Sequence, residues 1–139
     1  MSTEKNKAMV RRVIEEVINK GNMALADEII ASNYVYHFPG MEFKGPEGFK
    51  QFVTMMRAAF PDLHVTTDAM IAEGDIVAAR FKVTGTLKGN MMGMAPTGKQ
   101  MTIIEAIFIR FAGGKEVEAS PTIDRLDMFQ QLGIKPPAG

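Results

Sequence analysis

The sequence predicts an α+β fold in which helices pack on one side of a curved, antiparallel sheet. The first part of the chain has apolar residues at the three- and four-residue spacing of helices, whereas the second part has the two-residue alternation of strands. Helices that precede a run of strands are typical of the α+β class. Long strands with a few glycines are expected to curl into an open cone, and helices across its mouth would leave a cavity.

Three helices are expected in the N-terminal part of the chain. The first has one apolar face and ends at Gly21, a residue type that commonly terminates helices. A second, short helix would begin after Asn22, which suits an N-cap. The third would begin at Gly45-Pro46, because proline is favoured in a first helical turn, and would end before Pro61. The apolar positions of these helices are Val10, Val13, Ile14, Val17, Ile18, Leu25, Ile29, Ile30, Phe49, Phe52, Val53, Met56 and Phe60.

Strand patterns occupy most of the remaining chain. One short strand of aromatic and β-branched residues is expected at 34–38, where Pro39-Gly40 would end it. From residue 63 onward apolar and polar residues alternate, and two turn signals, at 73–75 and 113–114, separate long strands. Later strands are expected at 63–68, 76–85, 101–111 and 115–123, with a loop at 89–99 and a short C-terminal helix at about 126–132.

The composition limits the classes of function. The 139 residues suit a single domain, here residues 1–139. Sixteen basic and sixteen acidic residues cancel, which argues against nucleic acid or an anionic membrane as a partner. With no cysteine and two histidines, the chain has no disulfide and is not expected to hold a transition metal. The charged N-terminus is unlike a signal peptide, so a cytoplasmic location is expected.

Several runs of residues are shared with a known family. They are FPDLHV, AEGDIVAARFKVTGTLKG, GMAPTGKQM and IRFAGGKEVEASPTIDRLDMFQQLG. On these runs the chain resembles the SnoaL-like polyketide cyclases, or ester cyclases. The resemblance implies a nuclear-transport-factor-like cone, with three N-terminal helices packed across the sheet and a short C-terminal helix. It also implies a homodimer.

The resemblance further implies a reaction. Characterised members close the last ring of an aromatic polyketide by intramolecular aldol condensation, with neither metal nor cofactor. An aspartate near the C-terminus serves as their acid/base, and Asp124 matches its place ahead of QQLG. Burial beside Ile123 and Leu126 would raise the pKa of such a carboxylate and improve it as a base. The alternative role for Asp124 is the N-cap of the last helix.

Two further titratable residues are candidates for the site. Relatives often carry a histidine at the position of His37, where it could donate to a substrate oxygen; the alternative is a hydrogen-bonded histidine at a strand end. Glu105 interrupts an apolar strand and shares a face with Ile103, Ile107 and Ile109. It would either meet a ligand inside the cone or pair with a basic residue. Glu118 and Arg110 are expected to form a structural ion pair.

The remaining candidates would line the binding site, or else pack in the core. Tyr34 and Tyr36 share one strand face, and Phe52 and Met56 lie on the apolar stripe of the third helix. Met91 belongs to a methionine-rich loop. Two positions depart from the family pattern: Leu87 stands where the family often has histidine, and Ser120 stands where it has tryptophan.

These observations predict a cofactor-free enzyme for aldol cyclisation or isomerisation of a small hydrophobic carbonyl compound. Asp124 would be its acid/base, with His37 or Glu105 in support. The alternative is a non-catalytic module that binds a small molecule or dimerises. An epoxide hydrolase is a narrower alternative, but strand alternation puts Arg110 on the face opposite Glu105.

Overall fold

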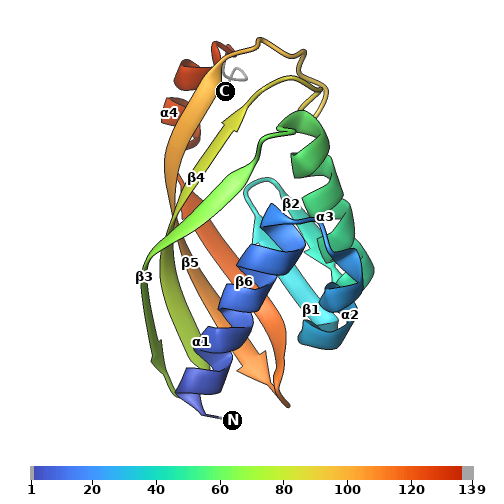
Figure 1. Cartoon of the computed structure of the whole chain (residues 1–139), viewed down its shortest axis with the longest axis vertical. Helices are drawn as coiled ribbons and strands as arrows, with labels where there is room; N and C mark the ends of the chain where they lie inside the picture. The colour runs from blue at the N-terminus through green and yellow to red at the C-terminus, as the bar shows by residue number, and fades with distance from the viewer. Residues whose placement is uncertain (1, 136–139) are drawn as a thin grey trace.

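The computed structural model describes residues 2–135 and shows one curved sheet with helices on its inner side (Figure 1). The six strands follow the order β2-β1-β6-β5-β4-β3. All neighbouring strands are antiparallel except β1 and β6, which are parallel. The helices α1 and α3 cross the sheet, and α4 packs beside β5 at one end of the molecule.

Helical segments come first along the chain, followed by two strands, one helix, four strands and a last helix. The strands are β1 (Ile30–Phe38), β2 (Met41–Lys44), β3 (His64–Glu73), β4 (Ile76–Thr86), β5 (Gln100–Ala112) and β6 (Lys115–Ile123). The helices are α1 (Thr3–Arg12), α2 (Ala26–Ile29), α3 (Gly45–Ala59) and α4 (Arg125–Leu132). A π-helical segment, η1 (Val13–Asn19), continues α1, and a 3-10 turn, η2 (Met23–Leu25), leads into α2.

The predicted α+β class and curved sheet are confirmed, and β4, β5, β6 and the last helix lie where the pattern placed them. The strand expected at 63–68 continues to Glu73, and the parallel pair of β1 and β6 departs from the antiparallel sheet that was predicted. The first part of the chain differs. The early strand begins at Ile30 rather than at residue 34, and Pro39-Gly40 connects it to the unpredicted strand β2 instead of ending it. Gly40 has a φ of 85°, which permits this tight hairpin turn. The N-terminal helical region also divides into more segments than the three predicted helices.

Polar contacts fix the N-terminal helix against the sheet. The side-chain amide of Asn19 both donates to and accepts from the backbone of Val65 in β3, at 2.9 and 2.8 Å. Arg57 of α3 donates to the carbonyl oxygens of Ile18 and Asn19, at 2.7 and 3.0 Å. These bonds satisfy carbonyls at the end of η1 that have no helical partner. Ile18 is thereby held over the inner face of the sheet.

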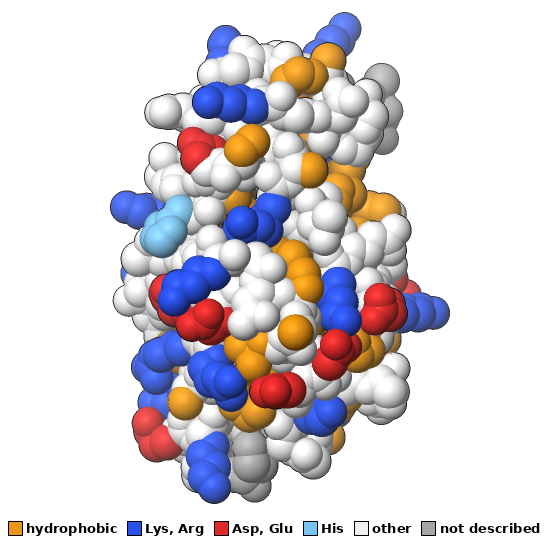
Figure 2. Space-filling model, turned by 45° about the vertical axis from the view of Figure 1, so that its right-hand side comes forward, with side chains coloured by type: hydrophobic (Ala, Val, Ile, Leu, Met, Phe, Trp, Pro, Cys, Tyr) orange, Lys and Arg blue, Asp and Glu red, His pale blue; other side chains and the backbone are white. Residues whose placement is uncertain are grey.

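Alternation along β5 separates an inner face from an outer face. Ile103, Ile107 and Ile109 are buried, whereas Ile104 and Phe108 are 48% and 62% exposed. Glu105 shares the inner face, as predicted. On the side where α2 and α3 lie, acidic and basic side chains are interspersed over the surface (Figure 2). Within residues 2–135, no helix is long and apolar enough to cross a membrane.

Candidate functional site

Three small cavities lie between the sheet and the helices. The α4 cavity, of about 50 Å³, lies between β5, α3, α4 and the loop after β4. The β3 cavity, of about 60 Å³, lies between η1, α3, β3 and β4. The α1 cavity, of about 40 Å³, lies between α1, β1, β5 and β6. Glu105 and Phe52 line all three, so the three spaces converge on one carboxylate and one aromatic ring.

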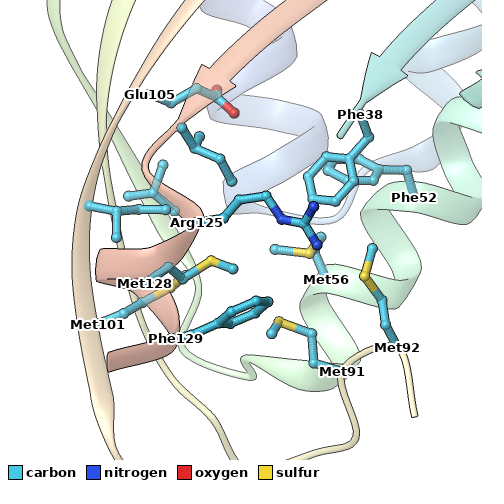
Figure 3. A pocket seen from close by; sticks show the side chains of 13 residues that line it. Phe38, Phe52, Met56, Met91, Met92, Met101, Glu105, Arg125, Met128 and Phe129 are labelled. Carbon is cyan, nitrogen blue, oxygen red and sulfur yellow. The ribbon is translucent and has the colours of Figure 1, made fainter. Parts of the chain in front are cut away.

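The α4 cavity is walled by soft, apolar side chains. Its methionines are Met56, Met91, Met92, Met101 and Met128, and its aromatic residues are Phe38, Phe52 and Phe129 (Figure 3). Methionine is flexible and polarizable, so such a wall adapts to a hydrophobic ligand. Met91 and Met56 lie where the sequence predicted.

Among residues 2–135, Glu105 is the only acidic side chain that lines the α4 cavity. It points from β5 into that space (Figure 3). Burial raises its pKa to about 7, and no hydrogen bond or ion pair with residues 2–135 opposes that rise. The side chain nevertheless keeps partial accessibility, because it borders cavity space rather than packed atoms. The sequence left two roles open for Glu105, a contact with a ligand inside the cone or an ion pair with a basic residue. The structure shows no ion pair between Glu105 and residues 2–135.

Arg125 supplies positive charge to the same cavity. Its side chain extends from the first turn of α4 toward the wall formed by Phe38 and Phe52 (Figure 3). The guanidinium carbon lies 5.6 Å from the centre of the Phe129 ring, a favourable cation–π geometry. Sequence reasoning did not single out Arg125, whose side chain could point either into solvent or into the cone. An arginine after a strand gives no pattern that distinguishes the two orientations.

Asp124 does not occupy the buried environment expected of it. Its side chain is exposed and accepts a hydrogen bond from the Asp127 amide at 3.0 Å, which caps α4. It lines none of the three cavities. The helix-cap alternative is therefore the geometry observed, because the backbone turns from β6 into α4 at this residue and directs the carboxylate along the helix end.

His37 also lies away from the cavities. Its two ring nitrogens contact Glu118 and Glu42, each at 2.9 Å. The hydrogen bond to Glu118 is the main cause of a raised His37 pKa, and the bond to Glu42 adds to it. The side chain of Glu118 also meets Arg110 at 3.4 Å, which confirms the predicted ion pair. His37 lies away from the cavities because side chains alternate along β1. Tyr36 faces the core, so His37 faces the opposite side of the strand.

The remaining predicted residues divide between cavity walls and other positions. Tyr34 and Tyr36 line the α1 cavity, and the ring centroids of Tyr36 and Phe52 are 4.6 Å apart. Leu87 is completely buried but lines none of the three cavities, because its backbone pairs with the loop at 98–99. Ser120 pairs with Phe108 across β5 and β6 and so shares the outer face. Neither Leu87 nor Ser120 is placed to meet a ligand in these cavities.

Sequence reasoning missed Glu116. Strict alternation from Ala119 would place it on the outer face with Glu118. A bulge in β6 instead pairs Glu116 with Phe111 and leaves Val117 as the extra residue. Glu116 is therefore 2% exposed and lines the α1 cavity, where burial raises its pKa to about 8. A bulge of this kind has no reliable sequence signal.

The comparison with protein families now adds to this geometry. The model of the family described as SnoaL-like polyketide cyclase matches residues 8–132. The chain belongs to this family. The match spans α1 to α4, and so includes every element that lines the three cavities.

Curated SnoaL-like relatives act on one kind of compound. The aklanonic acid methyl ester cyclase DauD of Streptomyces sp. (strain C5) is 30% identical over 131 residues, which is 90% of this chain and 80% of DauD. The aklanonic acid methyl ester cyclase DnrD of Streptomyces peucetius is 31% identical over 131 residues, which is 90% of this chain and 88% of DnrD. These similarities support a cyclase-type function.

Solved structures agree with the fold. TsrD from Streptomyces laurentii superposes with a TM-score of 0.87 at 21% identity, over 97% of this chain and 99% of TsrD. A SnoaL-like protein from Jannaschia sp. CCS1 gives a TM-score of 0.88 at 22% identity, over 96% of this chain and 95% of that chain. At these identities the comparisons show the SnoaL-like fold alone.

Proposed function

We propose that this SnoaL-like protein catalyses cofactor-free proton transfer on a small hydrophobic carbonyl compound, leading to aldol cyclisation or isomerisation, with Glu105 as the acid/base. The observation that carries the proposal is the position of Glu105, a carboxyl group that lines all three cavities and has no hydrogen bond or ion pair with residues 2–135. The similarity to DauD and DnrD, both aklanonic acid methyl ester cyclases, supports a carbonyl-bearing ester as the class of substrate.

The pKa of Glu105 suits this role. An acid/base catalyst works best when its pKa is close to the working pH, because both protonation states are then available. A glutamate in water, with a pKa near 4.5, is a weak base, whereas burial brings Glu105 to about 7. At neutral pH about half of the molecules would hold the carboxylate that accepts a proton.

The proposed reaction is neutral in oxidation state. The Glu105 carboxylate removes a proton from the carbon next to a carbonyl group, and the C–H electron pair becomes the C=C bond of an enolate while the carbonyl π pair moves to oxygen. In a cyclisation, the enolate carbon attacks a second carbonyl carbon of the same molecule and forms a C–C bond. The resulting alkoxide takes the proton back from Glu105. In an isomerisation, Glu105 returns the proton to a different carbon.

Arg125 would bind a second oxygen of the substrate. Its guanidinium group donates hydrogen bonds in a fixed planar pattern that suits a carboxylate, an enolate or a pair of carbonyl oxygens. Phe129 and the methionines of the α4 cavity would contact the apolar part of the same molecule. The substrate class that fits is thus apolar in its body, with oxygen atoms toward both Glu105 and Arg125.

Proton abstraction can be measured without knowledge of the natural substrate. Acetophenone in D₂O is a suitable probe, because NMR follows deuterium exchange at the methyl group next to its carbonyl. We expect the wild-type exchange rate to rise with pH up to about 7 and then level, as the Glu105 carboxylate forms. Glu105→Gln should lower the rate by at least ~100-fold.

Asp124→Asn is the matched comparison. It removes a carboxylate but keeps a good capping side chain, so it should leave exchange within about twofold of wild type. Rapid exchange by Glu105→Gln together with its loss in Asp124→Asn would assign the base to Asp124 and refute our proposal. Conversion of aklanonic acid methyl ester by wild type, followed by mass spectrometry and NMR, would then test the cyclisation itself.

A further inference from the structure

The α1 cavity is lined by two residues whose polar groups the proposed proton transfer does not use. Tyr34 is 1% exposed and Glu116 is 2% exposed, and both side chains line this cavity. The Tyr34 hydroxyl and the Glu116 Oε2 atom have no hydrogen-bond partner among residues 2–135. A buried polar atom without a partner typically costs about 1–3 kcal/mol, so two such atoms beside one cavity require an explanation.

Nothing else in the cavity wall supplies a partner for these groups. The wall contributed by α1, η1, α3 and β4 consists of aliphatic and aromatic side chains. The other titratable side chains that line it are Tyr36 from β1 and Glu105 from β5. No lysine, arginine or histidine of the described residues lines it. The Tyr34 hydroxyl and the Glu116 Oε2 atom are therefore buried beside a cavity and have no hydrogen-bond partner among residues 2–135.

We propose that the α1 cavity is an oxygen-binding subsite, in which the Tyr34 hydroxyl and the Glu116 carboxylic acid donate hydrogen bonds to the carbonyl oxygen of the bound compound. The inference rests on the proposed function, because the adjacent carbon would then meet Glu105, which lines the same cavity. The rest of the compound would extend past Phe52 into the neighbouring cavities.

The chemistry of the two donors fits a developing enolate. A neutral carboxylic acid can donate a hydrogen bond, whereas a carboxylate cannot. Burial keeps Glu116 protonated at neutral pH, since its pKa is about 8. Donors that are fixed in an apolar space stabilise negative charge on oxygen strongly, because they need no reorganisation as the charge forms. Glu105 would thus accept the proton, and Glu116 would stabilise the negative charge on the substrate oxygen.

Two probes of equal shape can test the subsite by binding alone. Acetophenone has a carbonyl oxygen where α-methylstyrene has a CH₂ group, and both dissociation constants can be measured by NMR titration. We expect wild type to bind acetophenone about tenfold more tightly than the alkene, since two donors lose their partner in the alkene complex. In Tyr34→Phe this preference should fall to about twofold or less.

Infrared spectroscopy gives an independent readout. The carbonyl stretch of ¹³C-labelled acetophenone should lie at lower frequency when bound to wild type than in an apolar solvent, and Tyr34→Phe should reverse much of that shift.

Glu116→Gln keeps a donor but cannot ionise. The ketone preference of wild type should therefore weaken above about pH 8, while that of Glu116→Gln should not. Glu118→Gln, on the outer side of the same strand, is the matched control and should behave as wild type.

The outcomes separate this inference from the proposed base. Equal binding of ketone and alkene by wild type, or an unshifted carbonyl stretch, would overturn the subsite and leave the cavity as a place for water only. Glu105→Gln should lose deuterium exchange yet keep the ketone preference and the infrared shift. If Glu105→Gln exchanges normally while the shift persists, the proposed base is wrong and the oxygen-binding subsite remains.

Discussion

At the scale of the residue, environment rather than residue type distinguishes the acidic side chains of this protein. Asp124 and Glu105 both carry a carboxyl group, but Asp124 is exposed at a helix end and Glu105 faces cavities inside the cone. Burial raises the pKa of Glu105 and of Glu116, whereas hydrogen bonds from His37 and Arg110 lower that of Glu118. Glu105 is therefore the candidate acid/base, because it lines all three cavities and has no ion pair with residues 2–135.

Arg125 permits a prediction about ligand charge. Benzoylacetate is acetophenone with an added carboxylate, which the guanidinium group could bind at the α4 end of the site. We expect Arg125→Met to weaken benzoylacetate about tenfold, as hydrogen bonds to charged groups are worth about 1.5–3 kcal/mol, and to change acetophenone affinity less than twofold. Isothermal titration calorimetry would measure both. Arg80→Gln, on an exposed strand position, is the control. Equal weakening of the two ligands would indicate lost packing and contradict an anion-binding role.

At the scale of the element, two local features of the last strand and helix position the site. The bulge at Val117 turns the Glu116 side chain toward the inner face of the sheet, while Glu118 stays on the outer face. Two glutamates that are two residues apart therefore lie on opposite faces. The cap at Asp124 starts α4 where Arg125, Met128 and Phe129 reach the α4 cavity. Gly133 ends that helix with a φ of 70°, a conformation that glycine adopts without strain.

The capping role of Asp124 has a measurable consequence for stability. Asp124→Ala should lower the free energy of unfolding by about 1 kcal/mol, because the Asp127 amide loses its acceptor. Asp124→Asn should lower it by a few tenths at most, since asparagine is a comparable N-cap. Urea denaturation of the three proteins would give these values. A stability of Asp124→Ala equal to that of wild type would argue against the cap.

At the scale of the whole molecule, the curved sheet encloses cavities on one face and leaves apolar side chains on the other. Ile71, Ile104 and Phe108 are exposed on strands β3 and β5. Exposed apolar surface of this kind is typical of interfaces. The homodimer implied by the family resemblance stays a prediction, for which this outer face is the region to examine.

The buried glutamates make the stability of the fold depend on pH. Both have folded pKa values above the ordinary 4.5, so the folded state binds more protons than the unfolded state between about pH 4.5 and 8. The stabilisation is complete below 4.5 and is lost as pH rises through about 7 and 8. Unfolding free energy should fall across this range by up to ~1.4 kcal/mol per pH unit for each group.

Denaturant titrations at pH 5.5, 7 and 8.5 would measure this slope. Glu116→Gln should flatten it, because glutamine carries no charge to bury. The Glu118→Gln control removes an exposed, ion-paired carboxylate and should keep the negative slope. A wild-type stability that rises over this range would mean that the buried glutamates ionise freely, and would contradict the environment described for them.

The sequence by itself determined the α+β class, most strand and helix positions, the family and the inward face of Glu105, because these depend on local periodicity and motifs. Only the tertiary structure decided that Asp124 caps a helix, that Arg125 enters one of the cavities and that Glu116 turns inward. Each of these depends on a turn, a bulge or the packing of a helix end, where one residue of register reverses the direction of a side chain. Such a reversal leaves the pattern of residue types almost unchanged, so it becomes visible only when the elements are placed in space.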